Sequence, residues 1–403
     1  MVVQLNSLET LFLASLCLLL GVHLKRRSSW LQRFCIPAPV AGGFIASILF
    51  WIGNETGLLD ISFNNILQPY LMVAFFILIG LGGSFRLLRS GGRLLLVYLG
   101  ICWFLVVSQT YLGLSLATML GLDPILGIMT GGVSLTGGHG GAAAFGTLAA
   151  EYGHERAVVV AIATATFGLF VGGLLGGPVA SYLINRHKVP IKVDALIDEK
   201  KIDKKSILKT LEGVSLDSFI KMLAVVLGIM VVSIYLIIWI EALIPGFRLP
   251  NYSAGMIVAI IFRNLNDYFN VVKLDQPSLE LISNSALGLF LTMAMLTLKI
   301  WELKAVALPL LVIWLVQVIF LVSLTVFVVF RLLGKNYDAA VMCSGLIGHG
   351  FGAQPNAVAN MTSVCEQYKA LSVKAFRIVP ITGSILIDIV GVPFLSWIIV
   401  YLA

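Results

Sequence analysis

Ten long runs without charged residues dominate the chain, five on each side of a polar segment, and the last is interrupted only by Asp388. About 20 apolar residues cross the hydrocarbon core of a bilayer, and helices satisfy their backbone hydrogen bonds there. The pattern therefore predicts an all-α polytopic membrane protein. The predicted spans are 10–24, 34–54, 61–85, 94–122, 157–185, 222–240, 249–262, 281–298, 305–330 and 378 to the end.

Composition supports this interpretation. The 403 residues are 59% hydrophobic and 12% charged, with a mean hydropathy of +0.99. Soluble domains carry about twice that share of charge, so a soluble globular protein is excluded. The net charge of +7 fits cytoplasmic loops rather than nucleic-acid binding. The five cysteines form no Cys-x-x-Cys pair, so neither a disulfide framework nor a zinc site is expected.

Basic residues orient the spans. They cluster in 25–33, 86–93 and 186–221, and cytoplasmic loops are enriched in Lys and Arg. We therefore expect these segments inside and both termini outside. No basic residue precedes the first run, which argues against a cleaved secretory signal. This orientation requires two Gly-rich stretches, about 124–154 and 336–368, to return to the side from which they enter. We interpret them as re-entrant hairpins.

The two halves resemble each other. Residues 138–140 recur as 348–350, and an offset of 215 then pairs Glu151 with Glu366, Gly168 with Gly383, Gly176 with Gly391 and Pro178 with Pro393. The predicted organisation is a first repeat (1–186), a cytoplasmic linker (187–217) and a second repeat (218–403). Each repeat holds five spans and one hairpin. An odd number of spans gives the repeats opposite topology, which is the inverted-repeat plan of secondary transporters.

The hairpin tips are the predicted binding site. Glycines in 137–141 are expected to break any helix, with a half-helix starting near Ala142, and Pro355 is well placed to begin another. Helix N-termini present unpaired N–H groups and bind anions, so two of them suit a small substrate with two carboxylates. The alternative is that the hairpins only pack tightly. The candidate substrate-binding residues are Thr136, Gly137, Gly138, His139, Gly140, Gly141, Gly352, Ala353, Gln354, Asn356, Asn360 and Arg377.

A second set of residues offers oxygen ligands to a coupling ion. Asp388 is an intramembrane acid, and such residues are functional candidates; a hydrogen-bonding role inside the protein is the alternative. Arg377 either clamps a carboxylate or snorkels to the interface. The two hairpin histidines are proton sites or packed residues, without partners for a metal. The candidate Na⁺ ligands are Asp388, Thr382, Ser384, Ser134 and Thr166.

Motifs along nearly the whole chain resemble the bacterial sodium/glutamate symporter family. They lie at 36–43, 89–93, 121–124, 134–140, 165–168, 176–180, 298–303, 334–340, 357–361 and 387–389. The resemblance implies Na⁺-coupled uptake of L-glutamate by alternating access across a bacterial cytoplasmic (inner) membrane, with both termini outside, and a homodimer. Three features differ from the usual family pattern. Gln354 and Asn356 stand where Thr is common, Arg377 stands where an apolar residue is usual, and Gly141 stands where Thr is common.

Other functions remain open at this point. One alternative is a Na⁺- or H⁺-coupled transporter of aspartate or another small carboxylate. A channel would not need half-helices arranged for binding. An intramembrane enzyme would need a nucleophile–base pair or metal ligands, and none stands out, so no enzymatic activity is expected. No Walker phosphate loop is present, which argues against ATP as the energy source.

Overall fold

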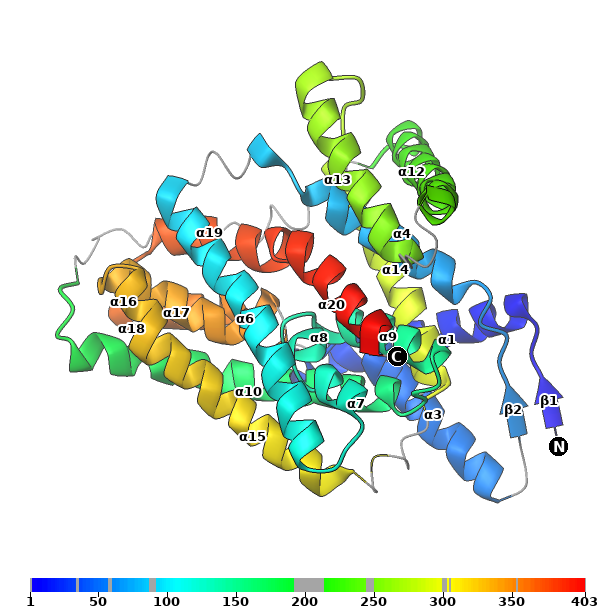
Figure 1. Cartoon of the computed structure of the whole chain (residues 1–403), viewed down its shortest axis with the longest axis horizontal. Coiled ribbons are helices and arrows are strands. Elements are labelled where there is room, and N and C mark those ends of the chain that lie inside the picture. The colour runs from blue at the N-terminus through cyan, green and yellow to red at the C-terminus, as the bar shows by residue number, and fades with distance from the viewer. Residues whose placement is uncertain are drawn as a thin grey trace.

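The computed structural model describes residues 2–33, 36–56, 60–86, 92–191, 214–243, 250–298, 303, 306–352 and 354–402, and the chain is mostly helical (Figure 1). The first half contains α1 (Ser7–Arg27), α2 (Ser29–Arg33), α3 (Ala38–Glu55), α4 (Gln68–Gly82), α6 (Gly92–Met119), α7 (Pro124–Met129), α8 (Gly132–Leu135), α9 (Gly138–Glu151) and α10 (Ala157–Arg186). The second half contains α12 (Leu216–Leu243), α13 (Asn251–Phe269), α14 (Gln276–Leu296), α15 (Ala307–Leu324), η2 (Thr325–Val329), α16 (Phe330–Leu332), α17 (Tyr337–Gly350), α18 (Gln354–Tyr368), α19 (Val373–Ile381), η3 (Thr382–Leu386) and α20 (Asp388–Leu402).

Six of these helical segments are long and apolar enough to cross a bilayer: α1, α6, α10, α12, α14 and the segment from α15 to α16. This confirms a multi-pass helical membrane protein. Shorter apolar helices occupy 38–53, 68–82, 124–135 and 388–402. The predicted total of ten spans stays a prediction. The linker predicted at 187–217 lies mostly outside the described residues.

Polar contacts set several helix ends. Asn6 and Glu9 form a reciprocal capping box at the start of α1. Helix α13 continues past its predicted end at 262, because its charged turn is paired. Arg263 Nε lies 3.0 Å from Asp267 Oδ1, and the Arg263 guanidinium donates to the Leu81 carbonyl at the end of α4. The positive charge of Arg263 inside α13 is therefore stabilised by Asp267 and by the carbonyl end of α4.

Two three-residue strands depart from the all-α prediction. Strand β1 (Val2–Gln4) pairs in parallel with β2 (Asp60–Ser62). Hydrophobic periodicity gives little signal over three residues, so sequence reasoning missed this pair. The strands lie beside the N-terminal end of α1, at the edge of the molecule (Figure 1).

Helix packing divides the molecule into two groups. We call α1, α3, α4, α12, α13 and α14 the frame, and α6–α10 with α15–α20 the hairpin body. Most contacts within the frame have a counterpart: α1 packs on α3 as α12 packs on α13, and α3 packs on α14 as α13 packs on α4. In Figure 1, α12 and α13 lie at the top and α15 at the lower left. The frame reaches the hairpin body where α14 contacts α9, α4 contacts η3 and α13 contacts α20.

Candidate functional site

A cavity of about 820 Å³ lies between the frame and the hairpin body. The hairpin body contributes 136–141 of the first hairpin, His349, Gly352 and Gln354 of the second, and a stripe of η3 and α20 that includes Asp388. The frame contributes residues of α1, α3, α4 and α14. A volume of this size suits a small organic ligand. Two segments more than 200 residues apart in the sequence therefore form one site.

The first hairpin contains three short helices. Asp123 caps α7, and α9 begins at Gly138 rather than near Ala142, so the prediction that glycines 137–141 break the helix throughout is wrong. The break is confined to Thr136 and Gly137, after which Gly138 takes a φ of +59° that glycine adopts without strain. Buried neighbours stabilise the glycines inside α9, which propensity alone disfavours. The N–H groups of the first turn of α9 therefore stand at the cavity.

The second hairpin is simpler. Helix α17 runs unbroken to Gly350, and α18 starts at Gln354 with Pro355 as its second residue, within one position of the prediction. Gly352 between them has a φ of +119°. Ala353 lies outside the described residues. A helix N-terminus thus follows the tip in both hairpins, next to the same cavity.

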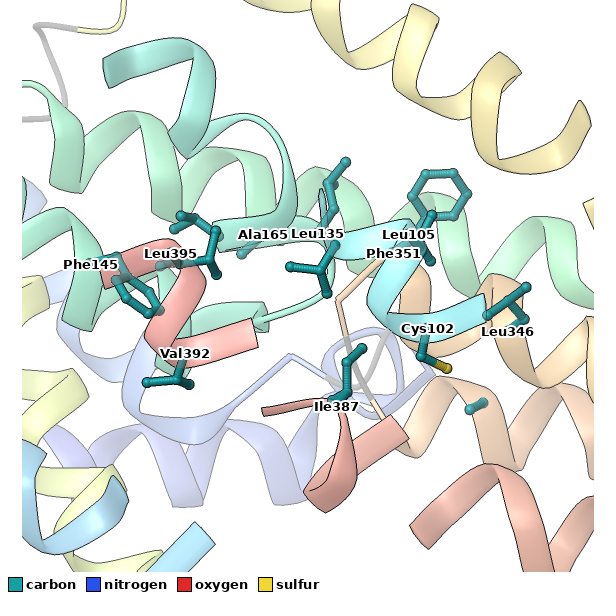
Figure 2. Packing of buried hydrophobic residues seen from close by; sticks show 14 of the residues in the cluster. Cys102, Leu105, Leu135, Phe145, Ala165, Leu346, Phe351, Ile387, Val392 and Leu395 are labelled. Atoms are coloured by element: carbon teal, nitrogen blue, oxygen red, sulfur yellow. The ribbon is translucent and has the colours of Figure 1, made fainter. Parts of the chain in front are cut away.

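The two tips touch through their backbones. A Cβ placed on Gly138 would lie 2.4 Å from the carbonyl oxygen of Gly352. Apolar side chains pack beside this contact: Leu135, Ala165 and Phe351 belong to one buried cluster and come from the first hairpin, α10 and the second hairpin (Figure 2). Close packing of this kind excludes any side chain at Gly138.

Each tip carries a histidine held by a hydroxyl. His139 Nε2 lies 3.0 Å from Thr166 Oγ1, and Thr166 donates its own hydrogen to the Ile162 carbonyl, so His139 is the donor in the pair. His349 Nε2 lies 2.8 Å from the hydroxyl of Tyr98, which is fully buried on α6. Both rings are therefore fixed, and both line the cavity.

Several polar atoms of the cavity wall have no partner among the described residues. They are Nδ1 of His349 and both amide atoms of Gln354, all buried. No hydrogen bond or ion pair from the described residues reaches the carboxylate of Asp388 either. A buried polar group without a partner costs about 1–3 kcal/mol. A ligand that pairs with these atoms recovers that energy.

Other predicted site residues lie away from the cavity wall. The amides of Asn356 and Asn360 donate to the Leu169 and Gly172 carbonyls at 2.7 and 2.9 Å, which ties α18 to α10. Thr382 is buried and donates to the Ile378 carbonyl, and Arg377 is exposed, as snorkelling predicts. The Ser384 side chain lies outside the described atoms.

Ser134 and Thr166 lie behind the cavity wall rather than on it. Their hydroxyls donate to backbone carbonyls, at 2.6 Å to Met129 and 2.9 Å to Ile162. The carbonyl oxygens of Ser134 and Ala165 both lie within 4 Å of the position that a Cβ on Gly352 would take, at 3.7 and 3.5 Å. Two backbone carbonyl oxygens of the first half therefore lie beside Gly352 of the second tip.

Sequence reasoning missed two polar residues of the frame. Asn284 and Ser285 of α14 are exposed and line the cavity opposite the hairpins. A signal was available, because 283–285 is the sequence Ser-Asn-Ser within an otherwise apolar span. Alignment of the Gln-Pro pairs that begin α4 and α14 places Phe76 at the position of Asn284. The frame thus presents polar groups from one half of the chain and aromatic groups from the other.

Known proteins resemble this chain over nearly its full length. The profile of the sodium/glutamate symporter family matches residues 3–370. The sodium/glutamate symporter of Escherichia coli (strain K12) is 38% identical over 395 residues, which cover 96% of each chain. The sodium/glutamate symporter of Haemophilus influenzae is 35% identical over 394 residues, which cover 97% of this chain and 96% of the relative. On these matches, the chain belongs to the sodium/glutamate symporter family.

Proposed function

We propose that the protein takes up L-glutamate together with Na⁺, as a secondary transporter of the bacterial inner membrane. The observation that carries this proposal is the cavity between the hairpin tips, where polar atoms without partners face an otherwise apolar wall. Unpaired polar groups at membrane depth mark ligand sites, because lipid offers them no hydrogen bonds. The names of the related proteins supply the ligand and the ion.

The first hairpin suits a carboxylate. The N–H groups of Gly138, His139 and Gly140 precede the first intrahelical bond of α9, in which Gly141 N donates to the Gly137 carbonyl. These groups and the positive end of the helix dipole stabilise an anion. Among the described residues no Lys or Arg lines the cavity. Backbone N–H groups therefore take the role that a cationic side chain plays in many carboxylate sites.

We place a Na⁺ ion behind the tips, near Ser134 and Thr166. Na⁺ is a hard cation that prefers oxygen ligands, and the carbonyl oxygens of Ser134 in α8 and Ala165 in α10 both lie near Gly352 of the second tip. The carbonyls of Ser134 and Ala165 and the hydroxyls of Ser134 and Thr166 are the ligands we expect. An ion there would lie against the backbone of Gly352 and so couple its binding to the position of the second hairpin tip.

Inverted repeats explain the paired contacts of the frame, and they make the two hairpins re-entrant from opposite sides. With the basic segments inside, the cavity extends to Val22 and Pro37, on either side of the cytoplasmic segment 25–33. We infer that this conformation faces the cytoplasm. Alternating access would follow from movement of the hairpin body against the frame. Both termini outside and a homodimer are further parts of the proposal, supported by the loop charges and by the family resemblance.

The test is uptake of radiolabelled L-glutamate into proteoliposomes. An inward Na⁺ gradient should drive accumulation, whereas an equal K⁺ gradient or a proton gradient alone should not. Unlabelled aspartate, glutamine and glutamate are then compared as competitors. Accumulation driven by protons without Na⁺ would refute Na⁺ coupling, and equal competition by glutamine would refute a dicarboxylate site.

A further inference from the structure

Three side chains of the second half meet on one wall of the cavity. A Cβ built on Gly383 of η3 would lie 2.9 Å from Oε1 of Gln354 and 2.9 Å from the ring of His349. The Gln354 amide and the His349 ring therefore both lie against the same glycine. Both line the cavity, and His349 is 2% exposed. Since Gln354 Nε2, Gln354 Oε1 and His349 Nδ1 have no partner among the described residues, this wall combines unused donors with an unused acceptor.

Tyr98 fixes which nitrogen of His349 carries the hydrogen. The phenol is fully buried, and among the described residues its only nitrogen or oxygen partner is His349 Nε2. A buried hydroxyl donates its hydrogen where an acceptor exists. Tyr98 therefore donates to Nε2, and the neutral ring carries its own hydrogen on Nδ1. The unpaired Nδ1 is consequently a donor.

The π-helical turn η3 brings the carboxylate of Asp388 to the same face. In this turn Ile387 N donates to the Thr382 carbonyl, five residues earlier. The extra residue shifts the helix register, so Gly383 and Asp388 both line the cavity. Among the described residues Asp388 is the only acidic residue of that wall. A single negative group thus stands beside the donors and the acceptor of Gln354 and His349.

We propose that His349, Gln354 and Asp388 bind the α-amino-acid end of the substrate, so that its side-chain carboxylate lies at the first hairpin. This rests on the proposed function. The His349 Nδ1–H and the Gln354 Nε2–H donate to the α-carboxylate, and the Gln354 Oε1 and the Asp388 carboxylate accept from the ammonium. These groups are complementary to an amino acid, whose ammonium donates to Asp388. A simple dicarboxylate has no donor for Asp388 and does not fit the set. Asp388 therefore determines specificity for the amine instead of binding Na⁺.

The test compares L-glutamate with glutarate, which keeps both carboxylates and lacks the amine. Binding of each to the purified full-length protein is measured by isothermal titration, first at saturating Na⁺ and then over a series of Na⁺ concentrations. The wild type should prefer glutamate, and Asp388→Asn should reduce that preference by about tenfold or more, because only glutamate loses an ion pair. Gln354→Leu, which removes the amide at similar size, should reduce it in the same direction. Glu366→Gln removes an exposed carboxylate of the same hairpin and should leave the preference unchanged.

The outcomes separate this inference from the proposed function. If the wild type binds no glutamate in Na⁺, the proposed function fails. If Asp388→Asn weakens glutamate and glutarate equally and raises the Na⁺ concentration needed, Asp388 is a Na⁺ ligand and the inference is overturned. An unchanged Na⁺ requirement with a lost preference for the amine supports it. If gel filtration shows that Asp388→Asn does not fold, the test rests on Gln354→Leu. An unchanged preference of Gln354→Leu for glutamate over glutarate overturns the inference.

Discussion

The two hairpins differ in how they meet the long helix beside them. The second hairpin is seated on α10, where Asn356 and Asn360 donate to backbone carbonyls and a Cβ on Gly168 would lie 2.5 Å from the Phe351 carbonyl. The first hairpin faces η3 and α20 across the cavity, and the wall there is formed by Gly391, Val392 and Leu395. A Cβ on Gly391 would meet nothing closer than 3.9 Å.

Similar sequence elements therefore have different structural roles in the two halves of the chain. Glycines of α10 let the second hairpin approach closely, whereas Gly391 of the last helix, which the sequence repeat pairs with Gly176, leaves room for a ligand. Close packing fixes the second hairpin on its neighbour, because interiors of this density do not deform continuously. We expect a substrate to enter on the open side and its specificity to be set there. Substitutions on the closed side should mainly change stability, and those on the open side should mainly change binding.

The largest effect is expected at Gly140 on the open side. Gly140→Val adds a branched side chain to the cavity, where a Cβ already lies 3.2 Å from the Phe75 ring. Glutamate binding should fall by at least about a hundredfold, or roughly 2.7 kcal/mol, with little change in the unfolding temperature. The matched control is Gly100→Val on the exposed face of α6, where a Cβ meets no described atom within 4 Å. Near-normal binding by Gly140→Val would contradict the site.

Adjacent glycines test the closed side. A Cβ on Gly176 would lie 2.0 Å from Asn360 Nδ2, whereas a Cβ on Gly177 would meet no described atom within 4 Å. Gly176→Ala should lower the free energy of unfolding by about 2–4 kcal/mol, because it displaces the Asn360 amide and overpacks the contact. Gly177→Ala should be neutral or slightly stabilising, as Ala favours helix. Thermal unfolding in detergent measures both, and equal effects would show that α18 is not held on α10 in this way.

A pair of asparagines separates stability from binding. Asn356→Ala removes a buried hydrogen bond to α10 and should cost about 1–2 kcal/mol of stability, with less than about a threefold change in half-saturating glutamate. Asn284→Ala on the exposed cavity face of α14 should leave stability unchanged and raise half-saturating glutamate by about three- to fivefold. Uptake assays and unfolding temperatures distinguish the two. The reverse pattern would place Asn356 in the binding site.

The smallest effect is expected at the base of the second hairpin. Lys374 Nζ lies 3.1 Å from Asp338, but the Lys374 side chain is 66% exposed. Exposed ion pairs contribute about 0–1 kcal/mol, so Lys374→Ala should leave unfolding and uptake nearly unchanged. At the base of the first hairpin, His154 pairs with Asp123, the residue that caps α7. His154→Ala should have a larger effect than Lys374→Ala, since the first pair is less exposed.

The helical, multi-pass character of the fold could be predicted from the sequence, whereas the inverted repeats and the total of ten spans stay predictions. Uncharged runs located the long helices, because lipid imposes a length and a composition that few other environments require. Helix ends that lie at charged residues were harder to predict. Helix α13 continues through Arg263 and Asp267 because these two residues pair with each other and Arg263 also donates to the end of α4. Such compensation is tertiary, and no local pattern indicates it. The start of α9 at Gly138 was missed for the same reason.

The candidate site was predicted in part. The tips, His139, His349, Gln354 and Asp388 meet at one cavity, as the repeated motif and the intramembrane acid indicated. Asn356 and Asn360 looked like ligand residues, since polarity near a tip does not reveal which way an amide points. Asn284 and Ser285 come from a helix of the frame, and their part in the cavity depends on packing between distant segments.

The most direct test of the central claim is protection of the cavity by substrate. Ser285→Cys places a nearly isosteric thiol on the exposed cavity face of α14, in a variant whose five native cysteines are replaced. In purified protein, a water-soluble maleimide should label this thiol, and L-glutamate with Na⁺ should slow labelling, whereas either alone should slow it much less. Ser215→Cys, outside the cavity, should be labelled at a rate that glutamate does not change. Labelling of Ser285→Cys at the same rate with and without glutamate and Na⁺ would contradict the account.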